Sequence, residues 1–134
     1  MSSNGFRLLA AGLATVLGTP VALAHHGVAG YDMDEVLELE GVVEHWGWQN
    51  PHTSLTLRLV VSGRVETVLI EGAPPRWMSG QGWTPESLEA GENVTITYHP
   101  TRLAGQGYDG ILMEVERGNG DVLKVNRPAW LGGP

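Results

Sequence analysis

The sequence predicts a mainly β protein, a small OB-like antiparallel β-barrel with a short helical connection between its third and fourth strands. Several short stretches alternate apolar and polar residues with the period-2 rhythm of half-buried strands. Glycine, proline and asparagine separate these stretches, as turns do. One longer stretch, between the third and fourth strands, lacks the alternation. This element order is that of a five-stranded OB-type barrel, although a small antiparallel sandwich would give the same pattern.

The first strand is expected to begin near Val36. Apolar residues and glutamates alternate along it, which predicts one buried and one solvated face. The buried face should carry Leu37, Leu39, Gly41, Val43 and His45. Asn50-Pro51 ends the run, because proline has no ladder donor and biases its neighbour away from helix.

The second and third strands, residues 55–61 and 65–71, flank Ser62-Gly63 and therefore read as a β-hairpin. Residues 94–99 predict the fourth strand. The last hairpin should pair residues 111–116 with 122–125.

The stretch between the third and fourth strands predicts two short helical turns. The first starts at Pro75. The second starts at Thr84, where a capping residue precedes a proline at the first helical position.

The first 24 residues have the layout of a cleavable secretory signal peptide. Arg7 is their only charged residue, an apolar run follows it, and the small-residue triplet Ala22-Leu23-Ala24 comes after Pro20. The apolar run is shorter than the roughly 20 residues of a membrane span. We therefore expect cleavage before His25, a periplasmic location and no membrane anchor afterwards; a retained N-terminal anchor is the alternative. The expected parts are a signal peptide (1–24), an extended N-terminal arm (25–35), the OB-like domain (36–127) and an irregular tail (128–134).

Composition narrows the classes of partner. The chain has 15 acidic and 8 basic residues, a formal charge of −7, and such a surface repels phosphate backbones, so no nucleic-acid partner is expected. The absence of cysteine rules out a disulfide framework and leaves stability to packing. There is no nucleophile elbow, phosphate-binding loop or dinucleotide motif, so an enzyme is the least favoured class.

Histidines at the expected mature terminus suggest a metal site. His25 would offer both its α-amino nitrogen and its imidazole Nδ1, which together close a chelate ring. Nitrogen ligands in tetragonal geometry favour Cu(II) among divalent metals. His26 and His52 are the further candidate ligands, and His45 and His99 are weaker ones. The alternative is that the two terminal histidines are only a leader and that His52 bonds to loop carbonyls.

Tryptophan suggests a second, metal-free function. The chain has five tryptophans, while its single phenylalanine, Phe6, lies in the expected signal peptide. Aromatic side chains at a barrel mouth could engage a protein partner or small ligand, making the protein a binding or adaptor module. The candidate residues are Trp46, Trp48, Asn50 and Trp83. The alternative is that the tryptophans pack in the core beneath the helical connection.

Taken together, these motifs resemble the domain of unknown function 6152 family, small exported proteins of Gram-negative bacteria. Members open the mature chain with His-His, continue with an aromatic-Asp pair and carry Trp-x-Asn-Pro-His. Those features stand here as His25-His26, Tyr31-Asp32 and Trp48-Gln49-Asn50-Pro51-His52; Gly41-Val42-Val43, Gly82-Trp83-Thr84, Ser87-Leu88, Gly91 and Val94-Thr95 also fit the family pattern. The resemblance implies an exported barrel and names no activity. His45 and His99 lie outside the motif.

Overall fold

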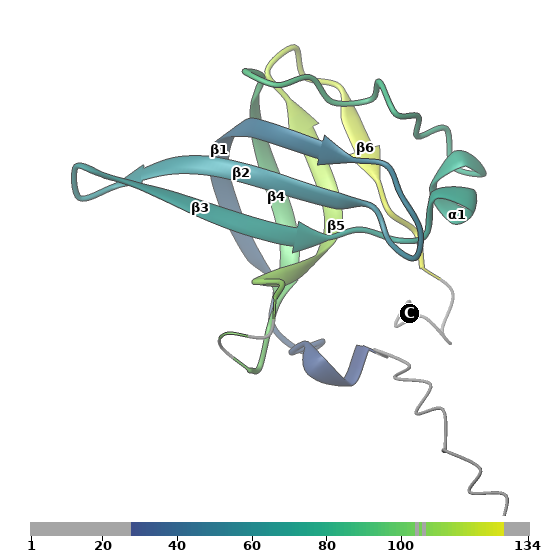
Figure 1. Cartoon of the computed structure of the whole chain (residues 1–134), viewed down its shortest axis with the longest axis horizontal. Coiled ribbons are helices and arrows are strands. Elements are labelled where there is room, and N and C mark those ends of the chain that lie inside the picture. The colour runs from purple at the N-terminus through teal and green to yellow at the C-terminus, as the bar shows by residue number, and fades with distance from the viewer. Residues whose placement is uncertain (1–27, 104, 106, 128–134) are drawn as a thin grey trace, which may run out of the picture.

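The computed structural model describes residues 28–103, 105 and 107–127. This part of the chain is mainly β, with six strands and one short α-helix (Figure 1). In chain order the elements are η1 (Val28–Gly30), β1 (Leu37–Gly47), β2 (Ser54–Val61), β3 (Arg64–Glu71), α1 (Pro75–Ser79), β4 (Asn93–Pro100), β5 (Gly110–Arg117) and β6 (Val122–Lys124).

The six strands form one sheet in the order β3-β2-β1-β4-β5-β6, in which these neighbours are antiparallel. In addition, the end of β3 pairs in parallel with the start of β5, through Ile70 with Gly110 and Glu71 with Ile111. The pairings therefore run in a closed ring from β3 through β2, β1, β4 and β5 back to β3. Figure 1 shows the β2–β3 hairpin projecting away from the rest of the sheet, on the side opposite α1.

Strand β1 begins one residue after the expected start and carries a β-bulge. Val43 pairs with Leu57, whereas His45 pairs with Thr56, so Glu44 is an extra residue in the ladder. The extra residue reverses the alternation beyond it. Val43 and Trp46 are buried, and His45 is exposed. The prediction that His45 shares the buried face of Val43 was therefore wrong, because simple alternation cannot anticipate a bulge.

The core fills the inside of this curved sheet. Its apolar side chains come from every strand of the ring, from the connection between β3 and β4, and from the residue that follows β6. The core cluster consists of Val43, Trp46, Leu55, Leu57, Ile70, Ala73, Met78, Trp83, Leu88, Val94, Ile96, Leu112, Val115 and Val125. With no disulfide in the chain, burial of these side chains is the main source of stability.

The connection between β3 and β4 contains one helix rather than two helical turns. Helix α1 begins at Pro75, where a proline costs no intrahelical hydrogen bond. At residues 84–87 there is only a hydrogen-bonded turn: Ser87 N donates to Thr84 O, and the Thr84 hydroxyl accepts from Glu86 N. The local capping chemistry was predicted correctly, but no helix follows it.

The described part of the N-terminal arm is folded onto the sheet. Residues 28–30 form the 3-10 helix η1, and Tyr31 forms an isolated bridge with Thr101, just beyond β4. An extended arm was expected because glycines and the lack of periodicity gave no sign of a partner. The partner is a segment 70 residues further along the chain.

A close backbone approach makes Gly110 a sensitive position. A Cβ there would lie 2.7 Å from His99 O and 2.3 Å from Tyr98 Cδ2. We expect Gly110→Ala to lower the free energy of unfolding by about 1–3 kcal/mol, the usual cost of overpacking, as measured by urea denaturation. Gly118→Ala is the matched control, because its Cβ would meet only Asn93 O at 3.5 Å. Equal effects of the two substitutions would contradict the prediction.

Candidate functional site

The turn after β1 and the end of β3 are fastened together by hydrogen bonds. Thr53 N donates to Ala73 O (3.1 Å), Gly72 N donates to Thr53 O (2.8 Å), and the Thr53 hydroxyl donates to Ala73 O (2.9 Å). Only glycine fits at position 72, because a Cβ there would lie 1.9 Å from Thr53 Oγ1. These contacts place His52 next to Glu71.

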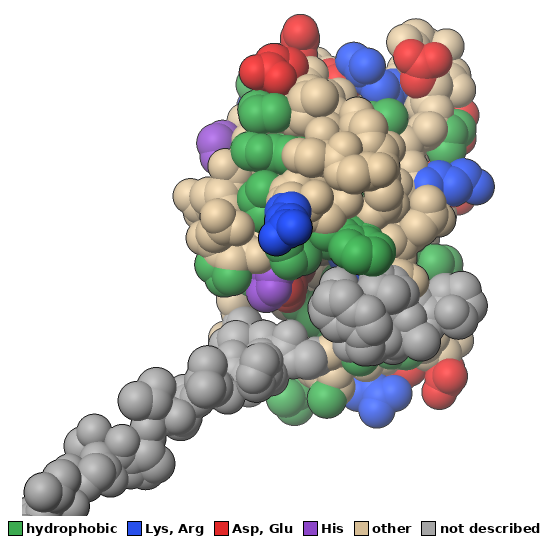
Figure 2. Space-filling view, turned by 90° about the vertical axis from the view of Figure 1, so that its right-hand side faces the viewer, with side chains coloured by type: hydrophobic (Ala, Val, Ile, Leu, Met, Phe, Trp, Pro, Cys, Tyr) green, Lys and Arg blue, Asp and Glu red, His purple; other side chains and the backbone are tan. Residues whose placement is uncertain are grey.

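His52 and Glu71 form a close pair at this end of the sheet. Nδ1 of His52 lies 2.7 Å from Oε1 of Glu71, and the two side chains are 26% and 6% exposed. The histidine therefore reaches the surface while the carboxylate is buried. Within the described residues, Nε2 of His52 has no hydrogen-bond partner. Figure 2 faces the side of the molecule that carries α1 and shows histidine side chains at this surface, one of them against an acidic side chain.

Tyr31 reaches the same carboxylate from the arm. Its hydroxyl donates to Oε2 of Glu71, so one carboxylate joins Tyr31 and His52. Burial of the phenol, together with its hydrogen bond to Glu71, raises the pKa of Tyr31 well above its usual value. Tyr31 is thus a permanent hydrogen-bond donor at neutral pH.

Arg127 completes the charge balance of this cluster. Its Nη1 donates to Leu112 O, whereas the buried Nη2 has no hydrogen-bond partner within the part of the chain that the structure describes. Burial lowers the pKa of Arg127 to about 10, against the opposing attraction of Glu71 and Tyr31. The guanidinium is therefore still a cation at neutral pH, and it offsets the buried charge of Glu71. Tyr108 borders the cluster as well, with its pKa raised by burial and by Glu71.

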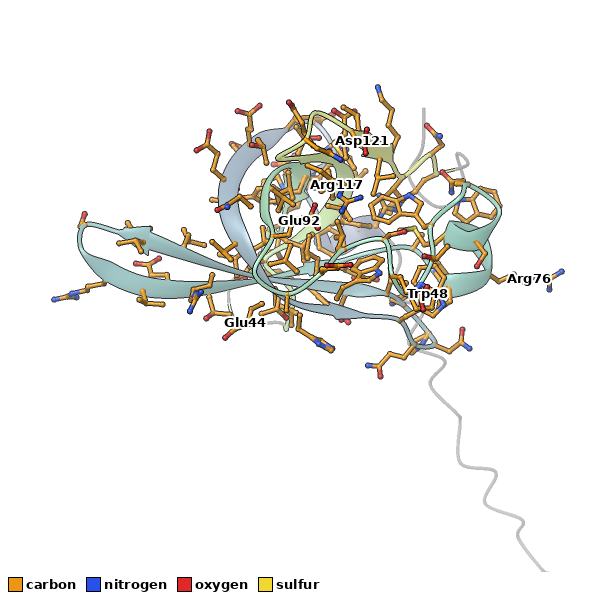
Figure 3. The ribbon with its side chains drawn as sticks, turned by 90° about the horizontal axis from the view of Figure 1, so that it is seen from above. Glu44, Trp48, Arg76, Glu92, Arg117 and Asp121 are labelled. Atoms are coloured by element: carbon orange, nitrogen blue, oxygen red, sulfur yellow. The ribbon has the colours of Figure 1, made fainter. Side chains whose placement is uncertain are left out.

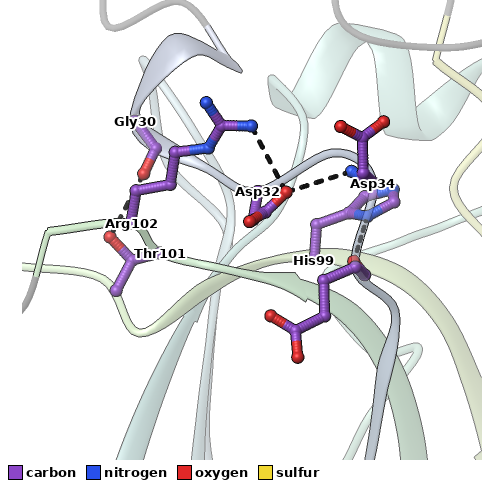
Figure 4. Close-up of polar contacts among 7 residues, drawn as sticks. Gly30, Asp32, Asp34, His99, Thr101 and Arg102 are labelled. Carbon is purple, nitrogen blue, oxygen red and sulfur yellow. Dashed lines mark hydrogen bonds and ion pairs between the residues drawn. The ribbon is translucent and has the colours of Figure 1, made fainter.

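The structure brings one of the predicted metal ligands into this cluster. His52 is a member, while His25 and His26 lie outside the described residues. His45 is exposed on β1, and His99 is buried with Nδ1 2.7 Å from Glu35 O (Figure 4). Among residues 28–103, 105 and 107–127, no three His, Cys, Asp or Glu side chains come together as a metal site.

The predicted aromatic mouth is divided between core and surface. Trp46 and Trp83 are core residues, 8% and 1% exposed. Trp46 lies between Trp48 and Trp83, with ring centroids 5.9 and 5.4 Å away, and its indole donates to Thr84 O. Trp48 is half-buried and Asn50 is exposed. Figure 3 shows Trp48 near helix α1. The interpretation that the tryptophans pack beneath the helical connection therefore describes Trp46 and Trp83, and only Trp48 and Asn50 remain accessible to a partner.

An open groove of about 810 Å³ lies at the other end of the strands. Its lining includes residues 40–42 of β1, 58–60 of β2 and 93–95 of β4. Arg117, which is paired with Glu92 (2.5 Å), also lines it (Figure 3). Of the predicted site residues that the structure describes, none lines this groove.

Sequence reasoning missed Glu71 and Arg127 as members of the cluster. Glu71 ends a strand and Arg127 follows the last strand, so neither position carries a local signal. Tyr31 did carry a sequence signal, because it is the aromatic residue of the Tyr31-Asp32 pair in the family motif. Only the tertiary fold brings positions 31, 52, 71 and 127 together.

In the described part of the chain, no helix has the length and apolarity needed to cross a membrane. Comparison with curated proteins and with solved structures gives no match. Comparison with family models gives a match to DUF6152, described as a family of unknown function, over residues 14–109. The matched range includes Tyr31, His52 and Glu71 of the cluster, as well as His25 and His26. On this evidence the chain belongs to the DUF6152 family.

Proposed function

We propose that this protein binds a divalent metal ion, with Cu(II) favoured, through Nε2 of His52 and the amino-terminal residues His25 and His26. The observation that carries the proposal is the contact between His52 Nδ1 and Glu71 Oε1 at 2.7 Å. Metal-binding histidines commonly donate their second ring nitrogen to a carboxylate in this way. The contact fixes the ring orientation and tautomer and leaves Nε2 as the basic nitrogen for a metal.

The chemistry of the proposed ligands favours copper. A mature chain starting at His25 would supply an α-amino group and an imidazole, which form one chelate ring, and His52 would add a further nitrogen. An all-nitrogen set of this kind suits Cu(II) or Ni(II), and copper stands higher in the affinity series. The α-amino group has a reference pKa near ~8 and imidazole near ~6.5, so few protons must be displaced at neutral pH.

The proposal includes export and an OB-like barrel. The signal-like residues 1–24 support export to the periplasm and cleavage before His25. The ring of pairings, with α1 between β3 and β4 and a parallel β3–β5 contact, supports an OB-like barrel. Export matters for the chemistry, because only a cleaved chain would place the α-amino group on His25.

The test is titration of Cu(II) into the processed protein, purified after export and checked by intact mass for loss of residues 1–24. We expect one equivalent to bind with a nitrogen-rich tetragonal electron paramagnetic resonance signal. His52→Gln should weaken binding at least about tenfold, in the range seen when a metal site loses part of its support. N-terminal acetylation should abolish the tetragonal signal, because the α-amino ligand is lost.

His45→Gln is the matched control, because His45 is exposed and lies outside the cluster. It should bind copper like the wild type. If His52→Gln and the acetylated protein bind as the wild type does, the metal proposal is wrong. The metal-free alternative, a binding or adaptor module for a protein or small ligand, would then rest on Trp48 and Asn50.

A further inference from the structure

The β2–β3 hairpin extends beyond the rest of the sheet as a two-stranded ribbon (Figures 1 and 3). Within the described part of the chain, β1 pairs with β2 only as far as Arg58, and β3 pairs with β5 only at residues 70 and 71. The hairpin itself continues to the pair Val61 and Arg64. Residues 64–68 of β3, called the free edge below, therefore have no described strand on their outer side.

The free edge presents backbone hydrogen-bonding groups. Because a two-residue turn closes the hairpin, Arg64 is hydrogen-bonded to β2, and the residues after it alternate between bonded and non-bonded positions. The N–H and C=O groups of Val65 and Thr67 therefore point away from β2. Leu69, the next residue in this alternation, donates to Asp109 Oδ2 (2.8 Å) and accepts from Asp109 N (2.7 Å). This contact has the expected direction, and it ends the free edge at residue 68.

The side chains of the free edge are open to solvent. Val65 is 67% exposed, and Val60, which faces it on β2, is 71% exposed. Arg64 and Glu66 flank Val65, are exposed and form no ion pair with another described residue. An exposed edge strand is a template for pairing with a further strand. The charges on either side of Val65 determine which strand fits.

We infer that β3 pairs with β3 of a second copy of this chain, antiparallel and about a two-fold axis at Val65. In this register the two copies of Val65 exchange N–H···O bonds, and Arg64 of one copy lies opposite Glu66 of the other. Opposite charges that face each other stabilise a strand pair. The same patch thus meets itself, as a two-fold interface requires. This inference goes beyond the proposed function and does not depend on a metal.

The charges and the contact with Asp109 favour this register over its neighbours. An axis at Glu66 would place Glu66 opposite its own copy, and facing like charges destabilise a strand pair. An axis at Thr67 would bring Leu69 opposite Val65, but the backbone groups of Leu69 are already bonded to Asp109. Because the free edge is short, we expect a reversible dimer with a smaller interface than permanent complexes have.

The test is sedimentation equilibrium of the processed protein from about 10 μM to about 1 mM, with a chelator and at low salt, where charge pairs are least screened. We expect the wild type to dimerise. Arg64→Glu and Glu66→Arg should each weaken dimerisation about tenfold, because each places like charges opposite one another. The double variant Arg64→Glu with Glu66→Arg should dimerise like the wild type, because its charges are complementary again.

Glu38→Arg is the matched control for net charge. It changes the charge as Glu66→Arg does, at an exposed position on β1 outside the hairpin. It should dimerise like the wild type. Circular dichroism of each variant reports whether the fold is intact.

Single cysteines test the register, because the chain has no cysteine of its own. At the axis, the Cα atoms of the two copies of Val65 would lie about 5.5 Å apart, within reach of a disulfide. The two copies of Thr67 would be offset by four residues, roughly 14 Å along the strands. Val65→Cys should therefore give a disulfide-linked dimer under mild oxidation, whereas Thr67→Cys, on the same edge, should give none.

Three results would overturn the inference. The first is a wild type that stays monomeric at the highest concentration, which would leave the free edge to a strand of another protein. The second is equal dimerisation of the wild type and both charge-reversed variants, which would place the contact elsewhere. The third is faster cross-linking of Thr67→Cys than of Val65→Cys, which would rule out the axis at Val65. Because the chelator removes metal ions, none of these results bears on the proposed metal site.

Discussion

Glu71→Gln is expected to lower the free energy of unfolding by about 1–3 kcal/mol, the range for disrupting the hydrogen bonds of a buried polar group. Glu71 is 5% exposed, accepts a hydrogen bond from Tyr31, contacts His52 and attracts the Arg127 guanidinium electrostatically. An amide has nearly the shape of the carboxylate but no charge. The substitution therefore weakens the bonds from Tyr31 and His52 and removes the electrostatic attraction between Glu71 and the half-buried Arg127. Urea denaturation at neutral pH measures the loss.

The double variant Glu71→Gln with Arg127→Met checks the physical reason. Methionine removes the cation and fills part of its volume, so the double variant should be more stable than the sum of the two single effects predicts. Replacing buried ion pairs with apolar residues is often neutral or stabilising. Strictly additive effects would contradict the charge balance described for this cluster. A loss of unfolding free energy below about 0.5 kcal/mol for Glu71→Gln, the size usual for surface positions, would also contradict the prediction.

Trp83→Ala is expected to cost about 3–5 kcal/mol, the range for truncating a large buried aromatic residue. Trp83 is 1% exposed, lies beside Trp46 and donates its indole N–H to Lys124 O (2.9 Å). It joins the β3–β4 connection to β1 and β6. Its loss would open a cavity and also leave Lys124 O without this donor. Denaturation followed by circular dichroism is the suitable measurement, because the substitution changes the tryptophan fluorescence itself.

Trp48→Ala serves as the comparison, because Trp48 is half-buried at the edge of the same cluster. It should cost clearly less than Trp83→Ala, since it buries less apolar surface. A larger loss for Trp48→Ala than for Trp83→Ala would contradict this prediction. The same variant removes one of the two accessible residues of the aromatic-mouth hypothesis, so it also serves in a search for partners.

The order and approximate limits of the strands could be predicted from the sequence. Alternation placed β2, β3, β4 and β5 to within about two residues, because each strand has one face toward the core and one toward solvent. Prolines and glycines marked where strands end, for the same local reasons. Family membership could also be predicted from the sequence, because motifs such as Trp48-Gln49-Asn50-Pro51-His52 are contiguous in the chain.

The tertiary structure alone decided how these elements meet. The bulge at Glu44 reversed the exposure of His45 and Trp46, and nothing in the local alternation marks an extra residue in a ladder. Likewise, Tyr31 and Arg127 come near Glu71 because the arm folds onto β4 and β3 closes against β5, whereas His52 lies beside Glu71 through the β2–β3 hairpin. Local sequence determines which face of a strand is buried. Contacts between residues 40 or more positions apart depend on sheet closure, and closure is a property of the whole chain.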